Sequence, residues 1–173
     1  MARRPRIYVT FGTVFNRSPA MTVAARAAAQ LAGTVVVTIG QDGDGSRLTG
    51  LGSNVHVHPF VNQGTLLPHC DVVVSHGGAG SLLGAAAHGV QQLILPQAAD
   101  HFRNARALTA LSAGRCVEPG CQTVDVVASS LAGLLHDGSL VLGATNLARE
   151  MAAMPDVGAA ACHLERWQAG APR

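Results

Sequence analysis

The chain lacks several features that mark common classes of protein. Its net charge is only +2 and it contains no Lys/Arg block, which argues against a nucleic-acid partner. Charged residues interrupt the apolar runs often enough that no membrane-length segment is present. The apolar stretch that follows Arg3, Arg4 and Arg6 is too short and too polar for a signal peptide. We therefore expect a cytoplasmic protein with no membrane span and no nucleic-acid partner.

Aromatic residues and cysteine motifs are also scarce. Aromatic residues make up only 3% of the chain, and the high hydrophobic content comes mostly from Ala, Val and Leu. The four cysteines lack CxxC spacing and are interpreted as reduced thiols packed as small hydrophobic side chains. His56 and His58 share one face of an expected strand, but no nearby residue completes a tetrahedral metal site. We expect no metal and no other cofactor.

Length and the order of elements predict one α/β domain. A chain of 173 residues falls within the usual size of a single domain. Apolar β-branched runs alternate with helical segments, an order that implies parallel strands joined by right-handed crossovers. We expect a doubly wound, Rossmann-like sheet of about six strands with helices on both faces and the first and fourth strands adjacent. The expected strands are 6–11, 34–39, 55–58, 72–74, 92–95 and 115–118.

Local signals bound the expected helices. Ser18 followed by Pro19 predicts the start of the first helix, and Gly33 predicts its end. The stretch 40–54 is rich in Gly, Asp and Ser, so we expect an exposed loop there. The other helices are expected at 63–67, from the glycine-rich turn to 89, at 100–113 ending at Gly114, at 123–137 with a stripe of Val127, Leu131 and Leu134, and as two further segments.

The central feature is the glycine-rich stretch 75–81, between an apolar strand and an Ala/Leu-rich helix. Glycines let a ligand approach the backbone, and we expect a β-branched side chain at Gly78 to fill that space. The start of the helix offers unpaired N–H groups and the positive end of its dipole, which suit a diphosphate. No Lys follows the glycines as in a P-loop, and Leu83 stands where a dinucleotide fold needs its third glycine.

Two interpretations of this stretch remain open, a ligand site or an ordinary turn between a strand and a helix. His76 at the carboxyl end of the strand favours a site. Gly12 and Thr13 follow the first strand, which we expect beside the fourth. Both loops should therefore face one crevice, at the place where doubly wound sheets bind ligands.

A long ordered set of motifs extends the pattern. The motifs are Phe60-Val61-Asn62-Gln63, His76-Gly77-Gly78-Ala79-Gly80-Ser81, Gly89-Val90-Gln91, Pro96 and Asp100-His101-Phe102-Arg103-Asn104-Ala105. With them, and with its opening VTFGT, the chain closely resembles the nucleotide-sugar-binding half of two-domain GT-B glycosyltransferases. The likeness is to the UDP-glucuronosyl/glucosyltransferase-like type, especially enzymes that decorate antibiotics and other natural products.

The resemblance implies a binding site for a nucleoside-diphosphate sugar. Phe60 would lie near the base and Val61 would bond the pyrimidine through its backbone, while Asp100 and His101 would bond sugar hydroxyls. The turn after the fourth strand, together with Thr13, would hold the diphosphate. Alternatives are that Phe60 is a core residue, that Ser81 only caps its helix, and that Asn104 is a capping or surface residue. The expected contacts are Thr13, Phe60, Val61, Gln63, His76, Gly77, Gly78, Gly80, Ser81, Asp100 and His101.

Three positions depart from the family pattern. Gln91 replaces the usual proline, and His101 replaces the more frequent Gln. Gly84 stands where many UDP-sugar enzymes carry a Glu that bonds the ribose hydroxyls. Deoxyribose lacks one of those hydroxyls, and a buried carboxylate without its partner would be costly. Gly84 therefore favours a dTDP-sugar, with UDP remaining open.

The resemblance assigns residues 1–173 to the donor-binding domain, without the N-terminal domain that supplies the acceptor pocket and the catalytic histidine. We expect the donor-binding half of a glycosyltransferase that moves a (deoxy)sugar from a dTDP- or UDP-sugar to a small natural-product acceptor. Because no residue here is assigned as the base, the chain alone should bind the donor without turnover. It would work with an N-terminal domain in cis or with a partner subunit. The alternatives are a stand-alone nucleotide-sugar-binding subunit and, less favoured, an NAD-type oxidoreductase.

Overall fold

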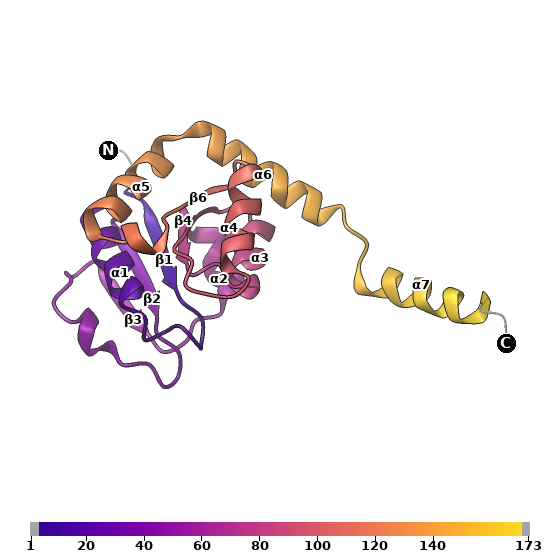
Figure 1. The fold of residues 1–173 in the computed structure, drawn as a ribbon, viewed down its shortest axis with the longest axis horizontal. Helices are drawn as coiled ribbons and strands as arrows, with labels where there is room; N and C mark the ends of the chain where they lie inside the picture. Colours follow the sequence, from indigo (N-terminus) through magenta and orange to yellow (C-terminus); the bar gives the residue numbers. More distant parts are fainter. Residues whose placement is uncertain (1–3, 171–173) are drawn as a thin grey trace.

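A computed structural model describes residues 4–170 and shows one α/β domain with a projecting helix at its carboxyl end (Figure 1). The domain contains a parallel sheet in the order β3-β2-β1-β4-β5-β6. The first and fourth strands are neighbours, so the predicted doubly wound sheet and its switch point are confirmed. The strands are β1 (Arg6–Thr10), β2 (Thr34–Thr38), β3 (Val55–His58), β4 (Val72–Ser75), β5 (Gln91–Ile94) and β6 (Gly114–Cys116).

Helices cover both faces of the sheet, as expected. On one face α1 and α5 pack against each other, and on the other α3 packs against α4 and α6 (Figure 1). The helices are α1 (Pro19–Leu31), α2 (Gln63–Leu66), α3 (Ala79–Ala87), α4 (His101–Ala110), α5 (Val124–His136), α6 (Gly138–Ala152) and α7 (Val157–Gly170). Short 3-10 turns lie at η1 (Gly45–Leu48), η2 (Leu67–His69) and η3 (Pro119–Cys121).

Alternation along the strands builds the two halves of the core. Ile7 and Val9 of β1 face the α1/α5 layer, whereas Tyr8 between them faces the opposite layer. The apolar stripe predicted on α5, which includes Leu131, is fully buried in the α1/α5 layer. Small alanines dominate the buried face of α1, which lets that helix approach the sheet and α5 closely.

The sequence analysis was wrong about the end of one helix and about the structure of one loop. The helix expected to reach Ala113 ends at Ala110, and Gly114 begins β6 rather than ending that helix. The reason is contact with a distant strand, because a Cβ atom at Gly114 would clash with the backbone oxygen of Gln92. The stretch expected as a simple exposed loop also contains η1, whose Leu48 is buried in the core.

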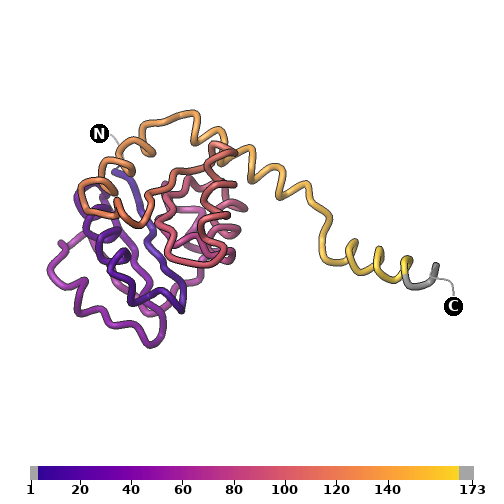
Figure 2. Tube along the Cα trace, viewed as in Figure 1, coloured from indigo at the N-terminus to yellow at the C-terminus, as the bar shows by residue number. Residues whose placement is uncertain are grey.

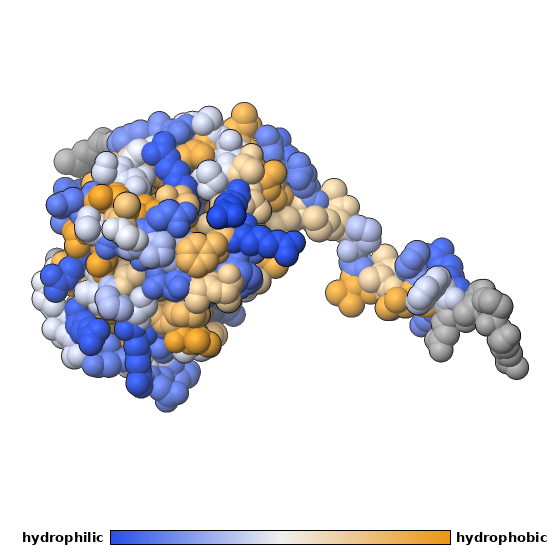
Figure 3. All heavy atoms as spheres, viewed as in Figure 1, coloured by the Kyte–Doolittle hydropathy of each residue, from blue (hydrophilic) through white to orange (hydrophobic). Residues whose placement is uncertain are grey.

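The last helix, α7, extends away from the domain (Figure 2). Its side chains are exposed up to residue 167, and Figure 3 shows apolar atoms on its surface. Val157, Leu164 and Trp167 are 86%, 62% and 77% exposed. Within residues 4–170, no single helix is long and apolar enough to cross a membrane; α5 and α6 pass that test only as a pair, bent by 75°.

Candidate functional site

The carboxyl ends of β1 and β4 bring two glycine-containing loops together. Gly12, with a φ of +64°, lies so close to the second loop that a Cβ atom on it would be 3.1 Å from Cε1 of His76. The predicted meeting of these loops is therefore confirmed. Thr13 is exposed beside the contact.

The turn after β4 ends at the open amino terminus of α3. Gly77 has a φ of +89°, a conformation that disfavours other residues, and its N–H donates to Oγ of Ser75 at 3.2 Å. Gly78 occupies the N-cap position, but no side chain caps the helix. The alternative that Ser81 is a capping residue is therefore wrong. The first N–H groups of α3, which have no partners within the helix, are left to an anion or solvent.

The glycines of this turn serve different purposes. A Cβ atom at Gly80 would have no heavy atom within 4 Å, so Gly80 borders open space. A Cβ atom at Gly78 would instead clash with Nε2 of His76. A side chain at Gly78 would thus displace the histidine first, which corrects the expectation that it would simply fill the ligand space.

His76 is buried among aromatic rings. Its ring lies 6.0 Å from that of Phe11, 5.6 Å from that of Phe15 and 4.6 Å from that of His101, centroid to centroid. Burial, reinforced by the neighbouring His101, lowers the pKa of His76 to about 4. The ring is therefore neutral at pH 7, and its buried Nδ1 has no hydrogen-bond partner among the described residues.

His101 is held by the loop that precedes α4. Its Nδ1 accepts hydrogen bonds from the backbone N–H groups of Gln97 (3.4 Å) and Ala98 (3.2 Å). The ring proton of the neutral imidazole must therefore lie on Nε2. Burial lowers the pKa of His101 as well, and the residue is only 4% exposed. Its capacity for a further contact is limited to donation from Nε2.

The loop before α4 is fixed by the side chain of Gln97, which contacts two distant segments of the chain. Its Nε2 lies within hydrogen-bonding distance of the backbone oxygens of Leu95 and Pro96 and of Oε1 of Gln122, at 2.9, 3.0 and 3.0 Å, and its two hydrogens are shared among these acceptors. Oε1 of Gln97 accepts from Oγ of Ser18 at 2.7 Å. Sequence reasoning missed Gln97, because its partners come from separate parts of the chain and no local pattern marks it.

Asp100 and Asn104 lie next to the glycine-rich turn. The Asp100 carboxylate is exposed at the N-cap position of α4 but does not cap that helix. Nδ2 of Asn104 donates to the backbone oxygen of Gly77 at 2.8 Å and to Oδ2 of Asp100 at 3.0 Å. Asn104 is therefore more than the capping or surface residue considered from the sequence.

The segment after β3 provides a different surface. Phe60 is 69% exposed, so the alternative that it belongs to the core is wrong. Val61 packs against the cluster that contains Tyr8, and Nε2 of Gln63 donates to the Tyr8 hydroxyl at 3.3 Å. A Cβ atom at Gly84 would lie 3.4 Å from Oε1 of Gln63. The gap left by Gly84 on α3 is thus bordered by the Gln63 amide.

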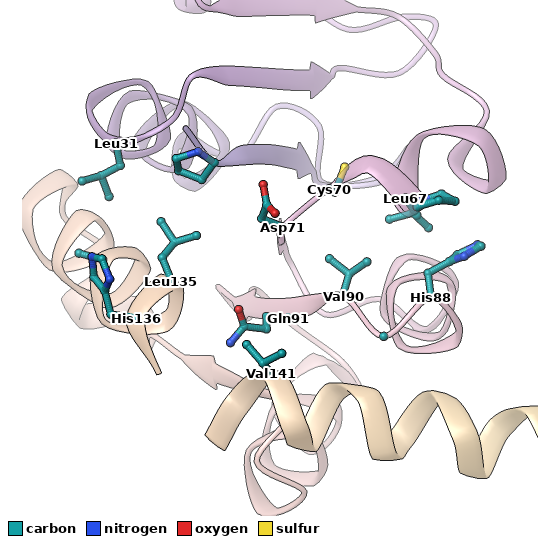
Figure 4. Close-up of a pocket in the computed structure, with 14 residues that line it drawn as sticks. Leu31, Leu67, Cys70, Asp71, His88, Val90, Gln91, Leu135, His136 and Val141 are labelled. Carbon is teal, nitrogen blue, oxygen red and sulfur yellow. The ribbon is translucent and has the colours of Figure 1, made fainter. Parts of the chain in front are cut away.

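A cavity of about 520 Å³ lies at the opposite edge of the sheet. It is lined at the amino ends of β1 and β5 and by α5 and α6, with Gln91, Leu135 and Val141 among its walls (Figure 4). None of the predicted contacts lines it. The described residues also contain no cluster of His, Cys, Asp or Glu suited to a metal ion.

Comparison with known proteins identifies the family. Residues 22–166 match the family model described as erythromycin biosynthesis protein CIII-like, C-terminal domain. The chain belongs to this family. The chain is 35% identical over 171 residues to TDP-daunosamine transferase DnrS of Streptomyces peucetius, covering 94% of the chain and 39% of the relative. It is 32% identical over 132 residues to demethyllactenocin mycarosyltransferase of Streptomyces fradiae, covering 76% of the chain and 28% of the relative.

A solved structure matches almost the entire chain. Spinosyn rhamnosyltransferase SpnG complexed with thymidine diphosphate superimposes with a TM-score of 0.86 at 30% identity, covering 95% of this chain and 46% of that one. The chain therefore spans less than half the length of these relatives. It corresponds to the C-terminal part of antibiotic-tailoring GT-B glycosyltransferases, as its motifs predicted.

Proposed function

We propose that this chain binds a nucleoside-diphosphate sugar in the crevice between the β1 and β4 loops. It would be the donor-binding half of a glycosyltransferase that moves a (deoxy)sugar to a small natural-product acceptor. The observation that carries the proposal is the uncapped amino terminus of α3, which opens at Gly80 onto free space. A diphosphate matches both the unpaired N–H groups and the helix dipole there.

The groups around the turn would divide the diphosphate contacts. The backbone N–H groups of Gly80 and Ser81 and the hydroxyls of Ser81 and Thr13 would bond phosphate oxygens. His76 would approach as a neutral ring, and the arriving negative charge would favour its protonation. Binding of the diphosphate and uptake of a proton by this buried ring are therefore expected to be coupled.

The gap at Gly84 supports thymidine as the nucleoside. Because this chain has Gly84 where many UDP-sugar enzymes have Glu, the sugar of the nucleoside would meet the neutral amide of Gln63. That amide offers one acceptor oxygen, whereas a carboxylate offers two. Such a group gives little advantage to a vicinal diol over one hydroxyl. The relative SpnG, solved with thymidine diphosphate, is consistent with this choice. Phe60 would cover the base, and Val61 would bond it through its backbone.

The start of α4 would hold the transferred sugar. Asp100 presents an exposed carboxylate, and Nε2–H of His101 offers one donor. Neither buried histidine is suited to remove the proton of an acceptor hydroxyl, since burial lowers the pKa of each ring and makes it a weaker base. We propose that the acceptor site and the base come from the part of the enzyme that these residues do not include, in cis or in a partner subunit, in the cytoplasm.

Calorimetric titration of the chain with dTDP, UDP and NAD tests the proposal. We expect dTDP to bind at least as well as UDP and NAD to fail. In Gly80→Val the new side chain would occupy the diphosphate space, so dTDP binding should be lost while thermal stability is kept. Gly138→Val is the matched control, because Gly138 also lies in the first turn of a helix with no heavy atom within 4 Å of its Cβ position.

Three results would count against the site. These are an unchanged dTDP affinity in Gly80→Val, an equal loss in Gly138→Val, or tight binding of NAD. The last would favour the oxidoreductase alternative. Donor binding together with transfer only after addition of a separate protein would favour the stand-alone subunit over a two-domain enzyme.

A further inference from the structure

The Asn104 side chain joins two parts of the crevice that lie far apart in the sequence. One hydrogen of its Nδ2 group bonds the backbone oxygen of Gly77 at 2.8 Å, and the other bonds Oδ2 of Asp100 at 3.0 Å. Gly77 belongs to the turn before α3, and Asp100 precedes α4. Both donors of one amide are therefore used to connect the turn with the start of the next helix.

The surroundings make this connection stiff. A Cβ atom at Gly77 would lie 2.7 Å from Cγ2 of Ile94 and 3.3 Å from the backbone oxygen of His101. The turn is thus packed directly on β5 and α4, with no room for a side chain. Asn104 itself is half-buried on α4, and its bond to the backbone oxygen of Gly77 is partly shielded from solvent.

The Asp100 carboxylate depends on Asn104 for its orientation. A carboxylate at the N-cap position usually accepts a bond from its own helix, but Asp100 makes no such cap bond. Its Oδ2 is held by the Asn104 amide instead, and its Oδ1 takes no part in that bond.

We propose that Asn104 is a positioning residue that couples the diphosphate part of the site to the sugar part. The inference rests on the proposed function, because it gives a role to a residue that need not touch the donor. By holding Gly77 and Asp100 together, Asn104 fixes the carboxylate relative to the bound diphosphate. The sugar then contributes to affinity only when this connection is intact.

A double-mutant cycle with two ligands tests the proposal. The chain, Asn104→Ala, Asp100→Ala and the double variant are each titrated with dTDP and with dTDP-glucose. We expect Asn104→Ala to weaken dTDP-glucose about tenfold, the order expected for a lost bond to a charged group, and to weaken dTDP much less. In the Asp100→Ala background, removing Asn104 should have almost no further effect on dTDP-glucose.

Matched controls separate positioning from folding. Arg106→Ala changes an exposed residue of the same helix and should leave both affinities unchanged. Alanine has a higher helix propensity than asparagine, so Asn104→Ala should not destabilise α4. The thermal midpoint of the variant is measured in parallel. Equal weakening of dTDP and dTDP-glucose would indicate a general structural role and overturn the proposal.

Two further results would also overturn it. One is an unchanged dTDP-glucose affinity in Asn104→Ala, and the other is a full tenfold effect that persists without Asp100. Failure of the unaltered chain to bind dTDP would refute the proposed function itself, and the positioning role with it. Because dTDP binding by the unaltered chain is read first, the two failures are distinguishable.

Discussion

At the scale of single residues, Gly84 is the position that bears on the proposed choice of nucleoside. Gly84 lies within α3, where glycine costs about 1 kcal/mol relative to alanine. The space beside it ends at the Gln63 amide and at Leu67, 3.4 and 3.5 Å from an added Cβ atom. These are ordinary contact distances, so packing around the Cβ position does not require the glycine.

We expect Gly84→Glu to shift nucleotide preference toward UDP. The new carboxylate can accept bonds from two ribose hydroxyls but from only one hydroxyl of deoxyribose. Each bond to a charged group contributes about 1.5–3 kcal/mol before desolvation, so the ratio of UDP to dTDP affinity should rise at least tenfold. Gly84→Ala separates the carboxylate from the change in helix propensity and should leave the ratio unchanged. A strong UDP preference in the unaltered chain would contradict the assignment of deoxyribose.

The buried His76 predicts a loss of stability on mild acidification. Its pKa is lowered from 6.5 to about 4 by burial, so between these values the unfolded chain binds a proton that the folded chain does not. The free energy of unfolding should therefore be highest above pH 6.5 and fall as the pH decreases toward 4, by up to about 3 kcal/mol. Urea unfolding at pH 7 and pH 5 measures the difference.

His76→Gln is the control for this pH dependence. Its unfolding free energy should fall less between pH 7 and pH 5, and the remaining decrease is assigned to His101, whose pKa is also lowered. Asp44 and Asp137 do not confuse the comparison. Hydrogen bonds from Ser46 and Ser139 lower their pKa values below 3.8, so their contribution is lost only at more acidic pH. Identical pH profiles for both proteins would refute the role of His76.

At the scale of elements, the loop between β5 and α4 is held in its conformation by hydrogen bonds to distant parts of the chain. Ala99 in this loop has a φ of +52°, which is unfavourable for a residue other than glycine. The bonds made by Gln97 to Ser18 of the α1 cap and to Gln122 hold the backbone in this conformation.

We expect Gln97→Ala to release this loop. The loss of its side-chain hydrogen bonds should lower the free energy of unfolding by about 1–3 kcal/mol and weaken dTDP-glucose more than dTDP, because His101 and Asp100 adjoin the loop. Urea unfolding and calorimetry measure the two effects. Gln30→Ala, at an exposed position of α1, should change neither. If both variants unfold at the same urea concentration, the Gln97 bonds add nothing to stability.

Elements bounded by local signals were predictable, and those bounded by distant contacts were not. Ser18 and Pro19 set the start of α1 through a cap bond and a fixed φ, and both lie within the sequence pattern. The boundary between α4 and β6 depends instead on the packing of Gly114 against β5. The sequence pattern of residues 100–118 does not indicate this contact.

The same distinction holds for the candidate site. The turn around His76 and the start of α4 stand in the sequence as recognisable motifs, and strand adjacency brought them together as expected. Phe15, which contacts the rings of both histidines, and Gln97 follow no motif. The buried state of His101 could not be predicted either, since it follows from three loops packing around one ring.

At the scale of the whole molecule, the predicted contacts gather at one edge of the sheet. The chain matches 46% of the length of SpnG, and its predicted contacts all lie at the carboxyl edge of the sheet. Exclusion of water and deprotonation of the acceptor would require a second surface over this edge.

We expect residues 1–173 alone to transfer no sugar. A hybrid in which this chain replaces the matching part of SpnG should transfer a sugar from a dTDP-sugar to spinosyn aglycone, and intact SpnG serves as the positive control. Mass spectrometry of the aglycone detects the product. Glycosylated aglycone formed by the isolated chain would show that the proposed division of roles between two halves is wrong.

The exposed position of α7 allows fluorescence to detect whether another protein covers that helix. Trp167 is the single tryptophan of the sequence, and it is 77% exposed on α7, the helix that extends away from the sheet (Figure 1). Its fluorescence should therefore resemble that of an indole in water and stay constant when dTDP is added. A shift of the emission to shorter wavelength would indicate that α7 has become covered, a change distinct from dTDP binding at the sheet.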